Sequence, residues 1–389
     1  MSPNGVPAAG VRWPSRAGAW LGIGTSPAAL ALGAGLAERH GGAIGVVGVA
    51  GGIALMAAML HAQGLIGVVP PTGEGTTLSG AADRYLAGWT LPALHMLLAL
   101  AMVGWFGFNV GLGGAALSAV TGAPAAAGPL LLGVPIVVVA ASGLHRWNAL
   151  AVGTTLCALA LVGLIVARFA PPVSPVAASA SSWLADAGAF VGYVAVFALR
   201  APDFSHNLAQ RADLRWCVGL LVGATGLVAV AGAALFLGTG TADVVGAITG
   251  GQGATLGNVL ITVAVVAATF TTLYSGSLAL RAITPVRPIV AMVAIATPGL
   301  VLAVARFDRM LLQWLAVLGA LLPPLLVPMA VEAARRRRGH EPRPVRMWTW
   351  VPAALIALTL TLRGVGVAAL VGFGVSAASM AIALRLRRR

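Results

Sequence analysis

The chain has 389 residues, of which 59% are hydrophobic and 9% charged, and its mean hydropathy is +0.94. A water-soluble domain carries far more charge, so this composition excludes one and indicates an all-α, polytopic membrane protein. The net charge of +14 is high enough to be compatible with a nucleic-acid-binding protein as well. The placement of the arginines favours the lipid bilayer instead, and no nucleic-acid partner is expected. The two cysteines, Cys157 and Cys217, are far apart in apolar surroundings and indicate neither a disulfide nor a metal site.

Twelve apolar segments, separated by clusters of proline, glycine and charge, are candidate transmembrane spans. They are 17–37, 42–62, 88–117, 127–143, 147–169, 183–201, 216–240, 255–280, 288–306, 310–331, 347–363 and 365–385. The short fourth segment contains Pro135 and is expected to be broken or tilted. The first apolar segment has no A-x-A-like cleavage site, so no cleavable signal peptide is expected.

The basic residues, all 24 of them arginines, are distributed unequally between the two sides of this arrangement. If both termini are cytoplasmic, 19 arginines lie on the cytoplasmic side and 5 on the other, the bias expected of cytoplasmic loops. The five are Arg39, Arg168, Arg306, Arg309 and Arg363. We therefore predict a multi-pass protein of the cell membrane with both termini in the cytoplasm. The run from Arg335 to Arg338 is interpreted as an orientation and lipid-headgroup anchor.

The ten carboxylates all lie at the ends of predicted spans or in loops. A relay of buried carboxylates for protons is therefore not expected. A cation site in this chain would have to use hydroxyl groups and backbone carbonyls.

The first span contains Gly22-Ile23-Gly24-Thr25-Ser26-Pro27 near its middle. Pro27 cannot donate a backbone hydrogen bond and disfavours helical geometry at Ser26. The pattern is compatible with a kinked, continuous helix. It is also compatible with a discontinuous helix, whose freed carbonyls and hydroxyls can hold an ion or a polar ligand.

The third span has four glycines whose spacing places them on one narrow helical face. They are Gly104, Gly107, Gly111 and Gly114. Small residues let a neighbouring helix approach closely, as is common in membranes. Trp105 and Asn109, four residues apart, share a roughly opposite face, and an amide in lipid needs a partner or a cavity. We therefore expect the Trp105–Asn109 face to line a binding site.

The sixth span has Gly192 at its middle, beside Tyr193, and is followed by Arg200-Ala201-Pro202-Asp203. If the chain is divided into two units of five spans, span six is the first span of the second unit. It therefore corresponds to span one. Interruptions at corresponding positions of two halves indicate a transporter site. We therefore expect spans one and six to be paired, interrupted helices.

The eighth span presents hydroxyl groups on one face, where Ala268, Thr271, Thr272 and Ser275 follow helical spacing. Hydroxyls in membrane helices commonly bond back to their own helix. Hard oxygen ligands on one face also suit a hard cation such as Na⁺. Both interpretations remain open at the level of sequence.

Four segments, in this order along the chain, resemble the nucleobase–cation symporter family. That family includes cytosine permeases, a hydantoin permease and transporters of hydroxymethylpyrimidine, a thiamine precursor. The segments are 22–35, Gly104-Trp105-Phe106-Gly107, Pro202-Asp203-Phe204-Ser205 and 271–280. The resemblance covers nearly the whole chain and implies a single transporter domain over residues 1–389. It implies two inverted five-helix repeats, at 17–169 and 183–331, followed by two additional C-terminal helices at 347–385.

The resemblance also implies a substrate site between spans one, three, six and eight. Trp105 corresponds to the family tryptophan that stacks on the flat substrate, and Asn109 to a glutamine that contacts the ring in the hydantoin permease. Gly192 and Tyr193 fall near a second stacking aromatic, and Pro27 lies at the break of span one. The implied sodium ligands are Ile23, Ser26, Ala268, Thr271 and Thr272.

The eighth span departs from the cytosine permeases, which have an asparagine-rich insertion between Thr-Thr and Leu-Tyr-Ser. These elements are contiguous here, so the substrate-binding asparagine has no clear counterpart, and Ser275 and Ser277 are the nearest candidates. A thiamine-precursor pyrimidine is therefore as compatible with the sequence as cytosine.

The sequence thus predicts a secondary active transporter, and not an enzyme, that imports a nucleobase or related planar heterocycle together with Na⁺ or H⁺. Hydroxymethylpyrimidine, allantoin and hydantoins are alternative substrates. An amino-acid or amine carrier of the same architecture is a further alternative, although an amine would be expected to require a buried acidic partner. An intramembrane enzyme or a sensor would need a buried His, Asp or Cys constellation, which the mid-span residues do not supply. No cofactor is expected, unless a coupling Na⁺ is counted as one.

Overall fold

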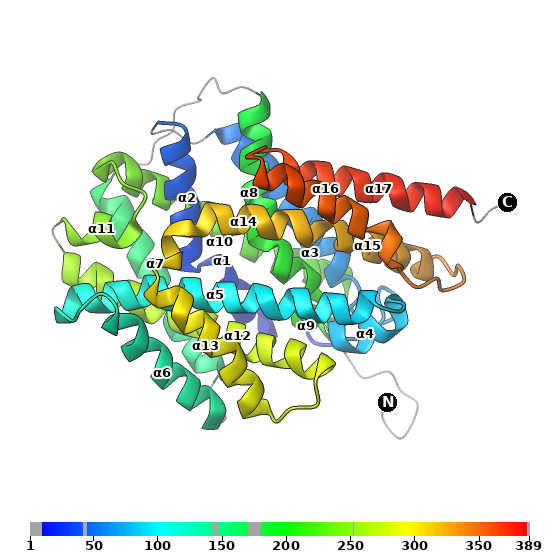
Figure 1. The fold of residues 1–389 in the computed structure, drawn as a ribbon, viewed down its shortest axis with the longest axis horizontal. Helices are drawn as coiled ribbons and strands as arrows, with labels where there is room; N and C mark the ends of the chain where they lie inside the picture. The colour runs from blue at the N-terminus through cyan, green and yellow to red at the C-terminus, as the bar shows by residue number, and fades with distance from the viewer. Residues whose placement is uncertain (1–9, 42–44, 143–146, 170–179, 252, 387–389) are drawn as a thin grey trace.

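The structure, a computed structural model, describes residues 10–41, 45–142, 147–169, 180–251 and 253–386. These residues form helices joined by short connections, and the only β-contacts among them are two isolated bridges, Val11 with Leu208 and Leu86 with Val345. Figure 1 shows the long helix Thr90–Thr121 running along the longest axis of the molecule, with other helices, among them Ala127–Ser142, inclined to it. The all-α architecture predicted from the sequence is therefore confirmed.

The helices of the first half follow the predicted spans. They are α1 (Ala17–Gly24), α2 (Pro27–Arg39), α3 (Val46–Gly64), α4 (Leu78–Tyr85), α5 (Thr90–Thr121), α6 (Ala127–Ser142) and α7 (Trp147–Arg168). A short 3₁₀ helix, η1 (Trp13–Ser15), precedes them. Residues 42–44, which begin the second predicted span, lie outside the described residues.

The second half continues with longer and shorter helices in alternation. They are α8 (Ala180–Leu199), α9 (Ala201–Ser205), α10 (Arg211–Thr239), α11 (Val244–Thr249), α12 (Ala254–Ile283), α13 (Pro288–Val304), α14 (Leu311–Leu321) and α15 (Pro323–Arg337). The 3₁₀ helices η2 (Phe307–Met310) and η3 (Met347–Thr349) precede α14 and α16 (Val351–Leu362), and α17 (Ala368–Leu386) is last.

Eight helices in the described part of the chain are long and apolar enough to cross a membrane, or nine if one bent pair counts as a span. That pair is α13 with the segment from η2 to α14, which meet at an angle of 87°. The helices α6 and α16 are shorter, with 16 and 12 residues. Helix occupies each of the twelve predicted segments, while the number of them that cross the bilayer stays a prediction.

The long helix α5 is the centre of the packing, in contact with α6, α12 and α13 along its length. Its four glycines lie directly against neighbouring elements, so that a Cβ at Gly104 would be 2.3 Å from the indole of Trp314. A Cβ at Gly114 would be 2.4 Å from the backbone nitrogen of Pro129. Gly107 packs in the same way against α13, and Gly111 packs against η2 and α13. The predicted glycine face is therefore confirmed as a surface of close helix packing.

The helices α2 and α10 approach each other through two glycines, one on each helix. A Cβ at Gly33 would lie 1.8 Å from the carbonyl oxygen of Ala229, and a Cβ at Gly232 would lie 2.0 Å from that of Leu30. Any larger side chain at either position would overlap the opposing backbone. The two helices are thus in direct main-chain contact.

The first span is discontinuous, which decides between the two interpretations of its sequence. The helix α1 ends at Gly24, and α2 begins at Pro27. Between them the Thr25 hydroxyl donates to the carbonyl of Leu21 at 2.8 Å, and the Ser26 hydroxyl accepts from the backbone N–H of Ala28 at 3.3 Å. The side chains of the break therefore cap the two helix ends.

The sixth span is interrupted at its end and not at its middle. The helix α8 runs unbroken through Gly192 to Leu199, and the interruption falls at Arg200, before the short α9. A Cβ at Gly192 would lie 2.0 Å from the carbonyl oxygen of Leu315, so this glycine serves close packing against α14. The expectation of an interruption near Gly192 is corrected accordingly.

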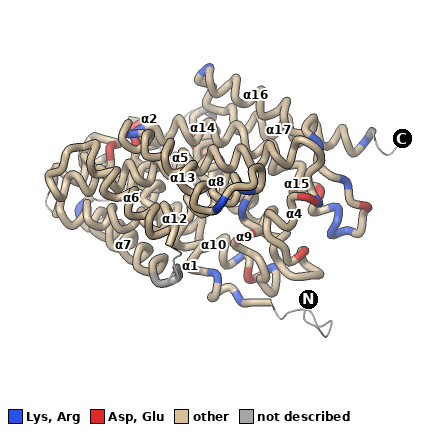
Figure 2. Tube along the Cα trace, turned by 60° about the horizontal axis from the view of Figure 1, so that its bottom comes forward, with Lys and Arg blue, Asp and Glu red and all other residues tan. Residues whose placement is uncertain are grey.

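Contacts between loops occur at the two ends of the bundle. Arg211 contacts His61 at one end, and Arg39 and Arg309 bind Asp186 and Asp243 at the other. Each pair joins residues predicted on one side of the membrane, in agreement with the predicted alternation of the loops. Figure 2 shows charged residues gathered mostly at the end that carries α4, α9 and α15. Which end faces the cytoplasm stays a prediction, and Arg146 and Arg387 to Arg389 lie outside the described residues.

Candidate functional site

The aromatic ring of Trp105 lies at the centre of the molecule, against helix α8. Its centroid is 5.8 Å from that of Tyr193, with the two planes at 87°, and 5.9 Å from that of Phe197. Phe108, one turn along α5, makes a second edge contact at 5.9 Å. Trp105 is 2% exposed and Tyr193 1%. The structure therefore brings together the two aromatic residues that the sequence placed on different spans.

The hydroxyl of Tyr193 joins this aromatic group to the break in the first span. It donates to the carbonyl oxygen of Ile23 at 3.2 Å, and the hydroxyls of Ser26 and Thr225 lie beside it. The same carbonyl accepts the backbone N–H of Ser26 at 3.3 Å. Tyr193 thus contacts a carbonyl that the resemblance assigned to a sodium site.

Polar atoms without partners lie on the same face of α5. The Nε1 atom of Trp105 and the Oδ1 atom of Asn109 are buried and have no hydrogen-bond partner among the described residues. An unpaired buried donor or acceptor costs about 1–3 kcal/mol. Because one atom is a donor and the other an acceptor, they are suited to a ligand that carries both functions.

The hydroxyls of the eighth span bond back to their own helix. Thr271 donates to the carbonyl of Ala267 at 2.9 Å, and Thr272 to that of Ala268 at 2.6 Å. Ser277 donates to Tyr274 at 2.7 Å. Each donating hydroxyl still has lone pairs on its oxygen, so these bonds are compatible with a cation ligand as well.

Two contacts between α5 and α12 show which part of α5 lies opposite the hydroxyls of α12. Thr262 donates to the carbonyl of Gly113 at 3.2 Å, and a Cβ at Gly276 would lie 2.9 Å from Met102. The two helices are therefore antiparallel, and Thr271 and Thr272 fall at the level of Trp105, about one turn from that of Asn109. Ser275 and Ser277 flank Gly276, about one turn below Trp105.

The remaining predicted residues lie at the break of the first span. Ile23, Ser26 and Pro27 are all buried there, and α1 and α2 both contact α12. The oxygen atoms of this break and of the eighth span are of the kind that Na⁺ prefers. Among the described residues, no group of three or more His, Cys, Asp and Glu side chains could hold a metal ion. A cation site here would therefore be built from neutral oxygen atoms.

Two aromatic residues of this centre were missed in the sequence. Phe108 follows Trp105 by three residues and Phe197 follows Tyr193 by four, so both follow helical spacing from a predicted residue. That spacing could have identified them. Trp314, which packs on Gly104 from α14, has no local signal of this kind, because its contact joins segments far apart in the chain.

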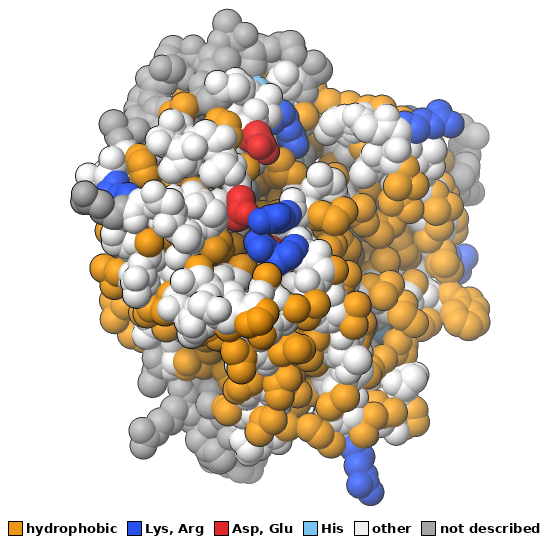
Figure 3. All heavy atoms as spheres, turned by 60° about the vertical axis from the view of Figure 1, so that its left-hand side comes forward, with side chains coloured by type: hydrophobic (Ala, Val, Ile, Leu, Met, Phe, Trp, Pro, Cys, Tyr) orange, Lys and Arg blue, Asp and Glu red, His pale blue; other side chains and the backbone are white. Residues whose placement is uncertain are grey.

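A cavity of about 450 Å³ opens beyond this centre, at the end of the bundle that carries α11. Its lining includes Gly35 and Glu38 of α2 and Leu112, which lies three residues beyond Asn109 on α5. Figure 3 shows acidic and basic side chains gathered around a hollow on this side of the molecule. The cavity is within the range of about 300–1,000 Å³ that ligand pockets occupy.

The charged groups at this cavity connect α11 with the bend between α13 and α14. Arg309 binds Asp243 at 2.7 Å, and Arg306 binds Asp308 at 2.9 Å and approaches Asp243 at 4.0 Å. Asp243 also caps α11 by accepting the N–H of Gly246. These ion pairs hold α11 against the bent segment beside the cavity.

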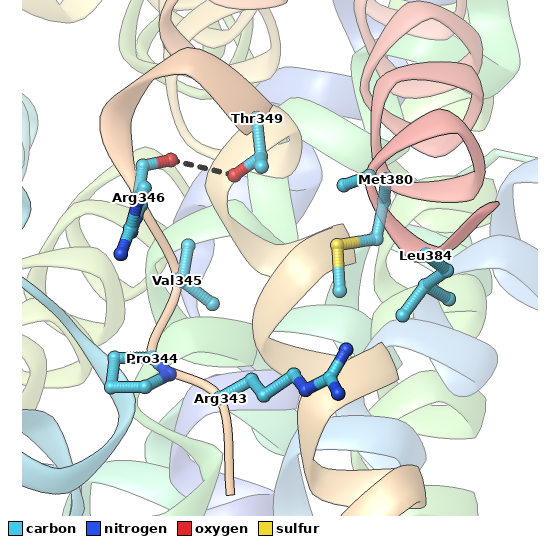
Figure 4. A pocket seen from close by; sticks show the side chains of 8 residues that line it. Arg343, Pro344, Val345, Arg346, Thr349, Met380 and Leu384 are labelled. Carbon is cyan, nitrogen blue, oxygen red and sulfur yellow. Dashed lines mark hydrogen bonds between the residues drawn. The ribbon is translucent and has the colours of Figure 1, made fainter. Parts of the chain in front are cut away.

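A second, very small cleft lies at the opposite end. Segment 343–346 and Met380 and Leu384 of α17 line it (Figure 4), and Thr349 donates to the carbonyl of Arg346 there at 2.7 Å. Its volume is about 10 Å³, which is room for about one water molecule. It is too small for a substrate.

A buried carboxylate lies in the N-terminal part of α8. Asp186 is 0% exposed and binds His40 at 2.7 Å and Arg39 at 3.3 Å. Its neighbours already balance its charge, and it lies at a helix end. Asp186 is therefore a link between α2 and α8 and not the free acidic partner that an amine carrier would require.

Comparison of the sequence with protein-family models and with the curated proteins finds no match. Comparison of the fold with solved structures finds several matches. One of them is Mhp1, described as a nucleobase-cation-symport-1 family transporter in a closed conformation with bromovinylhydantoin bound. It superposes on this chain with a TM-score of 0.71 at 18% identity, and the match covers 99% of this chain and 95% of Mhp1. An inward-facing conformation of Mhp1 gives 0.70 at 17% identity over 100% and 94% of the two chains. A variant of the Eremococcus coleocola manganese transporter gives 0.63 at 13% identity over 97% and 95%.

The chain is thus a polytopic membrane protein with the fold of these transporters along nearly its whole length. The resemblance seen in the sequence is confirmed at the level of the fold.

Proposed function

We propose that this protein is a secondary active transporter of the nucleobase–cation symporter type. It imports a nucleobase or a related planar heterocycle, such as cytosine, together with Na⁺ or H⁺. The observation that carries the proposal is the face of α5 at the centre of the fold. There an aromatic plane, Trp105, and an unpaired amide oxygen, Asn109, lie one turn apart beside a discontinuous helix.

Each part of this face has a role in the proposed binding. A planar ring gains from contact with the aromatic faces of Trp105, Tyr193 and Phe197. The amide of Asn109 pairs with the polar edge of the ring, and a ligand without that edge leaves the amide unpaired and is rejected. Pro27 lies at the break beside the ring, Gly192 lets α8 pack on α14 and so positions the neighbouring Tyr193, and Ser275 and Ser277 contact the ring from α12.

The coupling ion is proposed to bind at the break between α1 and α2. The oxygen atoms offered to Na⁺ come from Ile23, Ser26, Ala268, Thr271 and Thr272. An ion that favours one conformation of the break shifts the equilibrium between states open to either side of the membrane. Transport follows because substrate and ion then cross together.

Uptake of radiolabelled heterocycles tests this function directly. The protein is expressed in cells deleted for their own carriers, and uptake of cytosine, uracil, hypoxanthine and hydroxymethylpyrimidine is measured with and without sodium and a pH gradient. We expect saturable uptake of at least one of the four. Well-expressed protein that transports no planar heterocycle under any gradient would refute the proposal.

A thiamine-precursor pyrimidine is the second candidate substrate. The contiguous Thr271-Thr272-Leu273-Tyr274-Ser275 run is as compatible with it as with cytosine, because the eighth span offers hydroxyls in place of an amide. Competition separates the two candidates: hydroxymethylpyrimidine should displace labelled cytosine at lower concentration than cytosine itself if this alternative is correct.

A further inference from the structure

A histidine and an aspartate form a buried pair where the second half of the first span meets the sixth span. The Nε2 atom of His40, at the C-terminal end of α2, lies 2.7 Å from Oδ2 of Asp186 on α8. The His40 side chain is 8% exposed and the Asp186 side chain 0%. Arg39 donates to the other carboxylate oxygen, Oδ1, at 3.3 Å. Both oxygen atoms of the carboxylate are therefore engaged by side chains at the end of α2.

The pair lies between two helix ends of opposite polarity. His40 is the C-cap of α2, and Gly41 follows it with a φ of +67°, so the helix ends there. The Asp186 carboxylate lies at the first turn of α3, where Oδ2 is 3.1 Å from the position of a Cβ at Gly48 and 3.4 Å from that of a Cβ at Gly45. Cations are stabilised at helix C-termini and anions at helix N-termini. The charged form of each side chain is thus favoured by the helix end beside it.

Close packing holds the carboxylate in place. A Cβ at Gly48 would lie 2.9 Å from the Cβ of Asp186, so α3 and α8 are in direct contact at this point. Trp183, one turn before Asp186, lies against Gly45, with its indole 3.3 Å from the position of a Cβ there. The carboxylate therefore has little room to turn towards water. The strength of the link then depends on the charge of the His40 ring.

The other charged side chains near the pair are exposed. Glu38 precedes His40 by two residues, and Arg363 lies in the α16–α17 connection, which packs on α8 through Gly366. Among the described residues, Arg39 and His40 are the partners that form salt bridges with Asp186. Arg39 therefore supplies a permanent positive charge, and His40 supplies one only when its ring is protonated.

The helices that surround the pair add no other titratable side chain at this level. In the described chain, α3 has none before His61 in its last turn, and α10 has none in its second half. The helix α14 has none, and α17 has only Arg385, in its last turn. Charged residues of α9 and α15 gather at the opposite end of the bundle (Figure 2), and Asp243, before α11, is bound by Arg309. Histidine is the side chain whose charge changes between about pH 5 and 8, so His40 is the titrating group of this pair.

The helix that ends at this pair is also a wall of the large cavity. Gly35 and Glu38, in the last two turns of α2, line the cavity of about 450 Å³ together with Leu312 of α14. A Cβ at Gly35 would lie 2.9 Å from the Leu312 side chain, so the two walls meet there. His40, two residues beyond Glu38, joins the same end of α2 to α8. A change in this link therefore acts directly on the wall of the cavity.

We propose that His40 and Asp186 form a pH-sensitive catch that holds α2 in the position in which the cavity is open. At acidic pH the ring takes a proton from the surrounding solution on Nδ1, and the Nε2–H···Oδ2 bond becomes charge-assisted. Hydrogen bonds between two charged groups are about twice as strong as neutral ones. At higher pH the proton returns to the solution, the bond becomes weaker, and α2 leaves this position more readily. This regulation goes beyond the proposed transport and does not depend on which substrate is carried.

Thermal melting of the purified full-length protein tests the protonation of the pair. Because the bound proton strengthens the link, its stabilisation is present at acidic pH and is lost as the pH rises through the range in which histidine titrates. The test variant is His40→Gln, whose amide still donates a hydrogen bond but does not titrate. We expect wild type to exceed this variant in melting temperature by about 2 °C more at pH 5.5 than at pH 8. The control is His340→Gln, an exposed histidine at the opposite end of the bundle, which should keep the pH dependence of wild type.

Labelling of a cysteine in the cavity tests the effect on α2. Gln313 is exposed and lines the cavity, so Gln313→Cys, combined with Cys157→Ser and Cys217→Ser, reports access for a water-soluble thiol reagent. The rate is compared with and without His40→Gln at each pH, which cancels the pH dependence of the thiol itself. We expect His40→Gln to slow labelling about threefold at pH 5.5 and to leave it unchanged at pH 8.

Two results would overturn the proposal. One is a melting temperature that depends on pH equally in wild type and His40→Gln. The other is a labelling rate on which His40→Gln has the same effect at both pH values, since the pair would then not control α2. Should His40→Gln not fold, Asp186→Asn removes the charge of the other partner, and its pH dependence is judged in the same way.

Discussion

At the scale of single residues, the centre of the molecule combines aromatic rings with unpaired polar atoms. Trp105 contacts Tyr193 edge to face, and its Nε1 atom and the Oδ1 atom of Asn109 have no partner among the described residues. The aromatic edges and the polar atoms are complementary to a flat ligand with a polar rim. A purely structural core would gain more from an apolar side chain at position 109.

Replacing Trp105 by alanine should weaken binding of the transported heterocycle at least about tenfold. Loss of stacking on an aromatic side chain costs about 1–3 kcal/mol per ring. Equilibrium binding of radiolabelled ligand to purified protein measures the effect. Trp89→Ala is the matched control, because Trp89 precedes the same helix and is 77% exposed. Unchanged affinity in folded Trp105→Ala protein would show that the ring serves packing alone.

Tyr193 provides a test of the coupling ion. Its hydroxyl occupies the Ile23 carbonyl at 3.2 Å, in competition with a cation for the same oxygen. Tyr193→Phe removes a hydrogen bond of about 1 kcal/mol, so the apparent affinity for sodium should rise about fivefold. Sodium dependence of uptake is the measurement, with Phe197→Leu as the control for a changed aromatic contact. If uptake in both variants does not depend on sodium but depends on the pH gradient, the coupling ion is the proton.

At the scale of the helices, main-chain contacts through glycine determine how closely the elements pack. Gly33 and Gly232 let α2 and α10 touch, and Gly192 lets α8 touch α14. The sequence indicates such positions by spacing on α5, where four glycines share a face. It does not reveal the partner of a single glycine such as Gly192, since Leu315 is far away in the chain.

Gly232→Ala should lower the thermal stability of the protein markedly, by about 1–3 kcal/mol, because its Cβ would overlap the carbonyl of Leu30. The matched control lies on the same helix. Gly223 has open space around it, so Gly223→Ala should leave stability unchanged or raise it slightly through better helix propensity. Melting temperatures of the two variants in one detergent decide the matter. A Gly232→Ala variant as stable as the control would show that α2 and α10 can separate without cost.

At the scale of the whole molecule, the loops divide into two groups at opposite ends of the bundle. The arginine distribution predicts that the end carrying α4, α9 and α15 is cytoplasmic. A fluorescent protein fused after Arg389 should therefore fold and fluoresce, because it stays in the cytoplasm. A periplasmic phosphatase inserted after Gly240, which follows α10, should be active. The opposite result for both reporters would invert the orientation.

Much of the fold could be predicted from the sequence because hydrophobic length and proline position act locally. Pro27 indicates either a kink or a break at Ser26, of which the structure has the break, and the close-packed face of α5 follows from its glycines. The expected interruption at Gly192 was wrong, because a glycine within a helix is also what close packing requires, and only the neighbour decides. The contact between Tyr193 and Ile23 and the role of Trp314 depend on three-dimensional neighbours and have no local signature.

The contact between α2 and α10 has a mechanical consequence. With backbone against backbone at Gly33 and Gly232, the two helices form one rigid unit, and α1 is held to α10 in the same way, because a Cβ at Gly24 would lie 2.5 Å from the carbonyl oxygen of Leu221. Since α10 leads directly to α11, any outward tilt of α2 also pulls Asp243 away from Arg309. Spin labels on α2 and α10 should therefore keep a constant separation throughout the transport cycle, while the distance from either helix to α5 changes.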